Sequence, residues 1–258
     1  MEPIEDVAAG DLGGVAGGRG RYGIDGGIIG VSVFALVLAG ATAAGGWAVR
    51  HRRPGLAALA GVAGAAVAGS AASYLYSTGR GKLSVWAQVL DELSLRGDEQ
   101  VLDVGCGRGA VLMLAARRLP RGRAVGADLW RRRDQSGNSR AAAERNAVAE
   151  GVSERVDIVD GDARDLPFPS SSFDVVVSSL AISNIRGAQG RGLALHEAMR
   201  VLRPGGRVRI VDQGADQYAA VLKDAGFAGV TVQRLDWRTW YGIPGHHLTL
   251  VAASKPPA

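Results

Sequence analysis

The sequence predicts an α/β domain preceded by two long apolar helices. The first observation is a buried strand, Val101–Val104, followed by three alternate glycines and then by the helix-like run Ala110–Leu119. The second is an alternation of short apolar strands and helical segments from there to the C-terminus, which is typical of a largely parallel sheet covered by helices. The third is a pair of uncharged apolar runs near the N-terminus.

Length and composition allow one large domain, or one domain with an appendage, in 258 residues. The net charge of +5 and the isoelectric point near 9.8 are mildly basic. The arginines are scattered, with no aromatic-interleaved basic patch, so no nucleic-acid partner is indicated. Cys106 is the only cysteine, which excludes an intrachain disulfide and a cysteine-based metal site. No metal is expected, and the place of Cys106 in the glycine turn favours a packing role.

The N-terminal region divides into a tail and an apolar segment. Residues 1–25 are rich in glycine and acidic residues without hydrophobic periodicity, which predicts a flexible tail. Residues 26–76 are expected to anchor the protein in a membrane, with candidate spans at 26–49 and 55–76, because roughly 20 apolar residues cross a bilayer. The alternative, a pair of buried helices on a soluble domain, is disfavoured because surface helices need a polar face. Small residues at four-residue spacing would let the two helices pack closely, namely Gly61, Ala65, Gly69 and Ser73.

Three arginines between the two runs, Arg50, Arg52 and Arg53, leave the topology open. Positively charged loops favour the cytoplasm, so a single span over 26–49 would keep this loop and the downstream domain inside. Two spans would put the tail and the domain on one side and the arginines on the other. We favour two spans because both runs are long and uncharged.

The remainder of the chain, 77–258, is expected to form the α/β domain. A polar linker over 77–82 leads to an amphipathic helix over 83–93. Further helices are expected over 110–119, 141–150, 192–202 and 218–225. Strands are expected over 101–104, 124–127, 156–159, 173–177, 207–211, 230–233 and 247–253, with a turn at 203–206.

The glycine turn after the first strand is suited to binding a nucleotide. Gly105, Gly107 and Gly109 permit close backbone approach, and the first N–H groups of the next helix then point at the ligand. Asp128 ends the second strand, where its carboxylate can accept hydrogen bonds from both ribose hydroxyls, with Leu129 as an apolar wall for the base. Two alternatives stay open: Asp128 caps the next helix, or Gly105-x-Gly107-x-x-Ala110 is a dinucleotide fingerprint.

Polar residues also follow the next two strands. After the third strand, Asp162 can accept from the exocyclic amine of adenine, and the Ala163 N–H can donate to a ring nitrogen. The fourth strand runs into Ser178 at the carboxyl edge of the sheet, where ligands bind in such folds. The polar loop 131–139 is either a solvated connection or a lid over the site.

From about Leu83 to Lys255 the chain resembles a class I S-adenosylmethionine-dependent methyltransferase. More narrowly, it is similar to the type 11 domain of quinone-, sterol- and arsenite-type small-molecule methyltransferases. The dinucleotide alternative does not account for the last two of the four features that carry the resemblance. These features are Val101–Gly109 with Asp103 two residues before the first glycine, Asp128, Gly161-Asp162-Ala163 with Leu166-Pro167-Phe168, and Leu202-Arg-Pro-Gly-Gly206 before a strand.

The resemblance implies a Rossmann-like, seven-stranded sheet with an antiparallel last strand, and S-adenosyl-L-methionine as the cofactor. It implies that the methionine part of the cofactor lies on the glycine turn with Asp103 near its amino group. It further implies ribose binding at Asp128, adenine binding at Asp162 and Ala163, and contact with both cofactor and acceptor at Ser178.

The resemblance also implies an enzyme that methylates a small acceptor, and the adjacent apolar runs favour a lipophilic acceptor at the membrane surface. The domain is expected to face the cytoplasm, where the cofactor is made. Methyl transfer needs a general base only when the acceptor loses a proton, so no universal catalytic residue is expected. A non-catalytic, membrane-tethered cofactor-binding or interaction protein is the alternative. Candidate residues near the acceptor are Asn184, Tyr241, His246 and His247.

Overall fold

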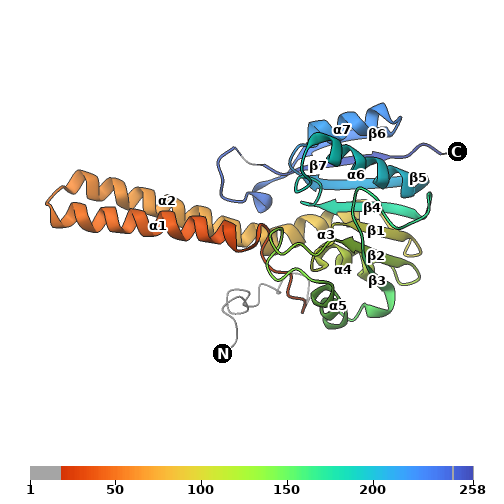
Figure 1. Cartoon of the computed structure of the whole chain (residues 1–258), viewed down its shortest axis with the longest axis horizontal. Coiled ribbons are helices and arrows are strands. Elements are labelled where there is room, and N and C mark those ends of the chain that lie inside the picture. The colour runs from red at the N-terminus through yellow and green to blue at the C-terminus, as the bar shows by residue number, and fades with distance from the viewer. Residues whose placement is uncertain (1–18, 246, 258) are drawn as a thin grey trace.

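The computed structural model describes residues 19–245 and 247–257, in which a long helical hairpin projects from an α/β domain (Figure 1). The hairpin consists of α1 (Gly27–Arg50) and α2 (Pro54–Tyr76). α2 continues through a π-helical turn, Ser77–Gly81, directly into α3 (Lys82–Glu92). The returning arm of the hairpin is therefore one rod with the first helix of the domain.

The domain is built on a seven-stranded sheet with the strand order β3-β2-β1-β4-β5-β7-β6. Strands β1 to β5 pair in parallel, whereas β7 runs antiparallel to both of its neighbours, β5 and β6. The predicted seven-stranded α/β sheet with an antiparallel last strand is confirmed. The strands are β1 (Gln100–Val104), β2 (Arg123–Asp128), β3 (Val156–Asp160), β4 (Phe173–Ser179), β5 (Leu202–Asp212), β6 (Ala228–Arg234) and β7 (Thr249–Ser254).

Helices cover both faces of the sheet, and each face buries its own core. Successive strand residues point to opposite faces, so Val101 joins the core under α3, α4 and α5, while Leu102 joins the core under α6 and α7. The apolar run of β1 thus reads as continuous because both of its faces are buried. The remaining helices are α4 (Ala110–Arg117), α5 (Arg140–Ala149), α6 (Ala188–Val201) and α7 (Ala215–Asp224).

Two short segments differ from the sequence expectation. The expected turn at 203–206 belongs to β5, which begins at Leu202 and pairs irregularly with the start of β4. The expected polar linker over 77–82 is the buried π-helical turn. Ser77 and Thr78 are buried in it because their hydroxyls have partners: Ser77 Oγ donates to the Trp240 carbonyl at 2.8 Å, and Thr78 Oγ1 accepts from the Asp25 N–H at 2.7 Å.

The end of the expected flexible tail is docked on the domain; residues 1–18 lie outside the described residues. Gly26 N–H donates to the Asp134 carbonyl at 2.8 Å, and Ser136 N–H donates to the Ile24 carbonyl at 2.9 Å. Tyr22 Oη donates to Glu150 at 2.6 Å. The first residue of the hairpin is therefore held on the domain, and the loop 131–139 is a docking surface for this segment rather than a solvated connection.

The hairpin exposes its apolar side chains. Leu36 is 76% exposed, Leu59 is 65% exposed and Val62 is 69% exposed. Among the described residues, both helices are long and apolar enough to cross a bilayer, a property that core helices of soluble proteins share. Core helices are mostly buried, however, whereas these two are almost uncovered by protein.

Candidate active site

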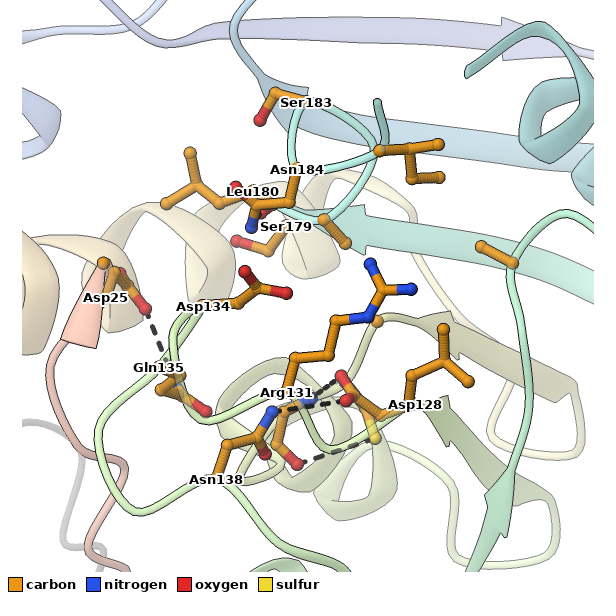
Figure 2. Close-up of a pocket in the computed structure, with 18 of the residues that line it drawn as sticks. Asp25, Asp128, Arg131, Asp134, Gln135, Asn138, Ser179, Leu180, Ser183 and Asn184 are labelled. Atoms are coloured by element: carbon orange, nitrogen blue, oxygen red, sulfur yellow. Dashed lines mark hydrogen bonds between the residues drawn. The ribbon is translucent and has the colours of Figure 1, made fainter. Parts of the chain in front are cut away.

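A cavity of about 670 Å³ lies at the carboxyl ends of the central strands (Figure 2). The glycine turn after β1 and the loops after β2 and β3 form one side, and the β4–α6 and β6–β7 loops form the other. The base of the hairpin closes a third side. The cavity brings together seven residues that the sequence singles out: Asp103, Gly105, Gly107, Asp128, Leu129, Asp162 and Ala163.

Positive φ angles and close neighbours explain the glycines of the turn. Gly105 has φ +73°, and an added Cβ would lie 2.1 Å from the Ala181 Cβ. Gly107 has φ +53°, and an added Cβ would lie 2.4 Å from the Gln135 Oε1. Gly109, also at positive φ, starts α4 and does not line the cavity. Two of the glycines therefore let the surrounding loops close on the turn, in addition to opening it to a ligand.

Asp103 is a buried carboxylate with unsatisfied oxygens. The residue is 1% exposed and lines the cavity, and neither of its carboxylate oxygens has a hydrogen-bond partner among the described residues. Burial, and after it the negative charge of Asp128, raises the pKa of Asp103 to about 7. A cation delivered into the cavity would satisfy this group, so the residues present fit the α-ammonium group of an amino-acid cofactor.

Asp128 is already engaged by the loops around it. Its Oδ2 accepts from the Gly107 N–H at 2.9 Å, and its Oδ1 accepts from the Trp130 N–H at 2.6 Å and from Asn138 Nδ2 at 3.2 Å (Figure 2). The carboxylate thus ties the glycine turn to the loop 131–139. It does not cap α5, whose N-cap is Ser139. Its position at the cavity wall leaves it available to ribose hydroxyls as well.

Asp162 and Ala163 lie at the rim of the cavity, after β3. Asp162 forms an ion pair with Arg164, with Nη2 and Oδ2 2.5 Å apart. This hydrogen bond from Arg164 lowers the pKa of Asp162, which is therefore ionised at neutral pH. An ionised carboxylate at this position can accept a hydrogen bond from an amine.

Ser178 does not lie on the cavity, which corrects the expectation from the sequence. It is buried, and its hydroxyl donates to the Val104 carbonyl at 2.9 Å across the β1–β4 pair. Ser179 lines the cavity instead, and its hydroxyl accepts from the Trp86 indole at 2.9 Å. The one-residue shift follows from the strand alternation, which turns adjacent side chains to opposite faces.

The sequence does not predict a polar cluster that lies at the base of the hairpin. The carboxylate of Asp25 accepts from Lys82 Nζ at 2.6 Å, from Tyr241 Oη at 2.8 Å and from Gln135 Nε2 at 3.5 Å, and its carbonyl accepts from the Tyr74 hydroxyl. All five residues of this cluster line the cavity: Asp25, Tyr74, Lys82, Gln135 and Tyr241. Burial, and after it the charge of Asp25, raises the pKa of Tyr241 well above its usual value. The only sequence signal is that Asp25 is the last charge before the apolar run.

The candidate acceptor residues separate in the structure. Tyr241 and Asn184 line the cavity, and Asn184 Nδ2 donates to the Leu180 carbonyl at 2.9 Å. His247 is not among the lining residues and contacts Arg234. His246 lies outside the described residues. Within the part of the chain that is described, no group of three or more His, Cys, Asp or Glu side chains is arranged to hold a metal ion.

Known proteins match the central part of this chain. Residues 102–210 match the family model of a methyltransferase domain. The ubiquinone/menaquinone biosynthesis C-methyltransferase UbiE of Cereibacter sphaeroides is 36% identical over 124 residues, which are 48% of this chain and 46% of the relative. The 27-O-demethylrifamycin SV methyltransferase of Amycolatopsis mediterranei is 31% identical over 153 residues, 56% of this chain and 52% of the relative. The chain thus spans about half the length of the curated relatives it matches.

A solved structure shares the fold. The geranyl diphosphate C-methyltransferase of Streptomyces coelicolor A3(2), in complex with Mg²⁺, geranyl-S-thiolodiphosphate and S-adenosyl-L-homocysteine, has a TM-score of 0.54 and 18% identity. The match covers 67% of this chain and 76% of that chain. At this identity the likeness concerns the fold alone. The family match over residues 102–210, the related sequences and the sheet order all agree with an S-adenosylmethionine-dependent methyltransferase domain in the core of this chain.

Proposed function

We propose that this protein transfers a methyl group from S-adenosyl-L-methionine to a small lipophilic acceptor at the cytoplasmic surface of the cell membrane. The observation that carries the proposal is the unpartnered carboxylate of Asp103 in a cavity that extends beyond the cofactor residues to the base of an exposed apolar hairpin. A cofactor half and an acceptor half thus share one cavity.

The cofactor half provides charge and hydrogen-bond acceptors. Asp103 would hold the amino group of the cofactor, Asp128 the ribose, and Asp162 with the Ala163 N–H the adenine. When bound, the cofactor supplies an electrophilic methyl group on a sulfonium. The chain's own contribution is to position the reactants and to exclude water, which the close packing of Ala181 on Gly105 and of Gln135 on Gly107 supports.

The acceptor half contains several apolar side chains among polar ones. Leu180, Ile243 and Leu248 line it together with the Tyr241 ring. One relative is named for ubiquinone/menaquinone biosynthesis, and this supports a lipophilic acceptor. If the acceptor must lose a proton, Tyr241 and its hydrogen-bond partner Asp25 are the nearby groups that could take it.

The docked segment 19–26 supports two membrane spans. It holds the start of α1 on the domain, and α2 runs back along α1 to the same domain. If α1 crosses the bilayer, α2 must return, so the domain and residue 26 lie on one side and Arg50, Arg52 and Arg53 at the tip lie on the other. Because the cofactor is made in the cytoplasm, we place the domain there. The charge bias of the tip arginines is statistical and opposes this orientation.

Methyl tracing tests the acceptor class. The purified full chain is incubated with methyl-labelled S-adenosylmethionine and phosphatidylcholine vesicles that carry a total membrane lipid extract, and the products are partitioned. We expect label in the organic phase with the wild-type chain and a loss of that label with Asp103→Asn. Label confined to protein or nucleic-acid fractions would contradict a lipophilic small-molecule acceptor.

A further inference from the structure

We infer that the acceptor enters the cavity sideways from the membrane leaflet, through a portal between the base of the hairpin and the β6–β7 loop. The inference rests on the proposed function and adds the route and the shape of the substrate. The occupant is a molecule with a single isoprenoid or acyl chain, whose chain stays in the leaflet while its polar head reaches the cofactor half. The starting observation is that Gly26 and Tyr74, where the two arms of the hairpin meet the domain, line the same cavity as Asp103.

The β6–β7 loop forms the opposite wall of the portal because it is fastened to the last two turns of α2. The Trp240 carbonyl accepts from Ser73 Oγ at 2.6 Å and from Ser77 Oγ at 2.8 Å. Gly242 fits so closely on α2 that an added Cβ would lie 2.1 Å from the Ser70 carbonyl oxygen. These contacts fix the position of the loop along the hairpin, beside the cavity opening.

Aromatic rings indicate that this part of the hairpin lies at the membrane–water boundary. Trp237 is 69% exposed and stacks on Tyr76, with ring centroids 5.3 Å apart. Tyr74 meets Tyr241 edge-on at 5.7 Å. Tryptophan and tyrosine prefer this boundary, where one end of the ring is apolar and the other is hydrated. The exposed apolar side chains of α1 and α2 lie beyond this ring cluster, toward the tip.

The portal combines an exposed apolar side chain with an ion pair whose charges cancel. Ile243 is 42% exposed and also lines the cavity, so it faces both the outside and the interior. The charges in the wall, Asp25 and Lys82, neutralise each other in an ion pair of which little is exposed. An apolar chain can pass such a wall without leaving a charge desolvated and unpaired.

The opposite rim of the cavity differs in chemistry. Charged side chains of both signs line it, and they suit exchange of a water-soluble cofactor rather than passage of a hydrocarbon chain. One cavity thus has a polar opening toward water and an apolar opening toward the leaflet, which keeps the two substrates on separate routes. The charged lining residues of this rim are Arg131, Arg133, Asp134, Asp162 and Arg164.

Photo-crosslinking tests the portal without requiring turnover. The full chain is reconstituted in phosphatidylcholine nanodiscs and exposed to a C15 isoprenoid alcohol that carries a diazirine beside its hydroxyl group, or to a water-soluble C5 analogue. Labelled peptides are mapped by mass spectrometry. We expect the C15 probe to label residues 179–186 and 236–248, and the C5 analogue to label them at least fivefold less.

A matched pair of variants locates the route. Ile243→Asp places a charge at the portal, whereas Val232→Asp places one on β6 at a side chain of similar exposure, 43%, that does not line the cavity. Ile243→Asp should reduce labelling of residues 179–186 at least fivefold. Ile243→Ser should reduce it less, and Val232→Asp should not reduce it. Unchanged cofactor affinity in each variant is the control for folding. Equal labelling in Ile243→Asp and Val232→Asp, or equal labelling by both probes, would overturn the portal. Such a result would not affect the evidence from methyl tracing for transfer into lipid, so the portal and the proposed function can be refuted independently.

Discussion

Asp103 has the environment that we expect of a ligand-binding residue and not of a structural one. A carboxylate that is buried without a partner opposes its own ionisation, and proteins keep such groups where a ligand completes them. In this chain the carboxylate lies beside the glycine turn and within the field of Asp128. The free energy that its burial costs is recovered only when a cation binds.

The first prediction is therefore a pH-dependent cofactor affinity. In the free protein the pKa of Asp103 is raised to about 7. A bound ammonium group favours the ionised form, so the pKa falls on binding and affinity is lost as pH falls below 7. Lowering the pH from 7.5 to 6 should weaken binding of S-adenosylmethionine by about tenfold, since each unit below the free pKa costs about 1.4 kcal/mol.

Calorimetry at the two pH values measures this effect. Asp103→Asn cannot titrate, so it should bind weakly at both pH values and show no comparable slope. A wild-type affinity that stays constant between pH 6 and 7.5 would remove Asp103 from the amino-group site.

The second prediction concerns Asp128. Asp128→Ala should weaken cofactor binding by about 1–3 kcal/mol, the scale of hydrogen bonds left unsatisfied. Asp157→Ala is the control, because Asp157 pairs with Arg123 on the exposed side of β3, away from the cavity. Calorimetric affinities that are equal in the two variants would show that Asp128 does not contact the cofactor.

The sequence places the proposed cofactor residues at the cavity because each follows a strand that is itself easy to recognise. Asp103, Asp128 and Asp162 occupy the cavity as their positions predict. The choice between Ser178 and Ser179 depends on which face each side chain of β4 takes, and two adjacent serines carry no pattern that decides it. Asp25 is missed for another reason: its partners, Lys82 and Tyr241, are brought to it only by the tertiary fold.

At the scale of elements, the glycine turn and the loops around it form one close-packed unit. Ala181 in the β4–α6 loop sits on Gly105, and Gln135 in the loop after β2 sits on Gly107. Side chains far apart in the sequence thus require glycine at the turn. A glycine motif that predicts ligand binding is therefore required in part by the packing of neighbouring loops against the turn.

The third prediction separates the packing requirement from backbone strain. Gly105→Ala adds a methyl group 2.1 Å from the Ala181 Cβ at φ +73°, whereas Gly151→Ala has φ +68° with no atom within 4 Å. Both variants carry the strain of positive φ, about 1 kcal/mol, and only the first carries the clash, about 1–3 kcal/mol more. Denaturant unfolding in detergent measures both. Equal losses of stability would mean that the loop relaxes around the added methyl group.

Two segments are polar or irregular in sequence and yet pack against the domain. Ser77 and Thr78 are buried because α2 continues through them and their hydroxyls form hydrogen bonds with Trp240 and Asp25. Residues 19–26 have no periodic pattern, yet Glu150 and Asn146 hold them on α5. Hydrogen bonds between distant segments leave no local signature, so neither feature can be derived from composition.

At the scale of the whole molecule, the hairpin and the domain are joined at three places. The docked segment before α1, the π-helical turn after α2 and the β6–β7 loop all meet around Asp25. The described contacts therefore fix the base of the hairpin against the mouth of the cavity. This arrangement supports a domain that works at the membrane surface and not at the end of a loose tether.

The fourth prediction is that the tail and the domain share one side of the membrane. A cysteine introduced as Gly10→Cys should resist an impermeant thiol reagent on intact cells, whereas His51→Cys at the exposed tip of the hairpin should react. Cys106 is buried and gives little background. Labelling of Gly10→Cys on intact cells would exclude two spans with a cytoplasmic domain, and recovery of the wild-type chain in the soluble fraction without detergent would exclude the anchor.

The measurement that tests the central claim most directly is the formation of S-adenosylhomocysteine by the purified full chain in phosphatidylcholine vesicles. The fifth prediction is that S-adenosylmethionine alone is bound without turnover, and that a total membrane lipid extract in the vesicles starts steady product formation, which Asp103→Asn abolishes. Binding of the cofactor with no S-adenosylhomocysteine under any acceptor extract, lipid or aqueous, would contradict the account and identify the protein as a membrane-tethered binding or interaction protein.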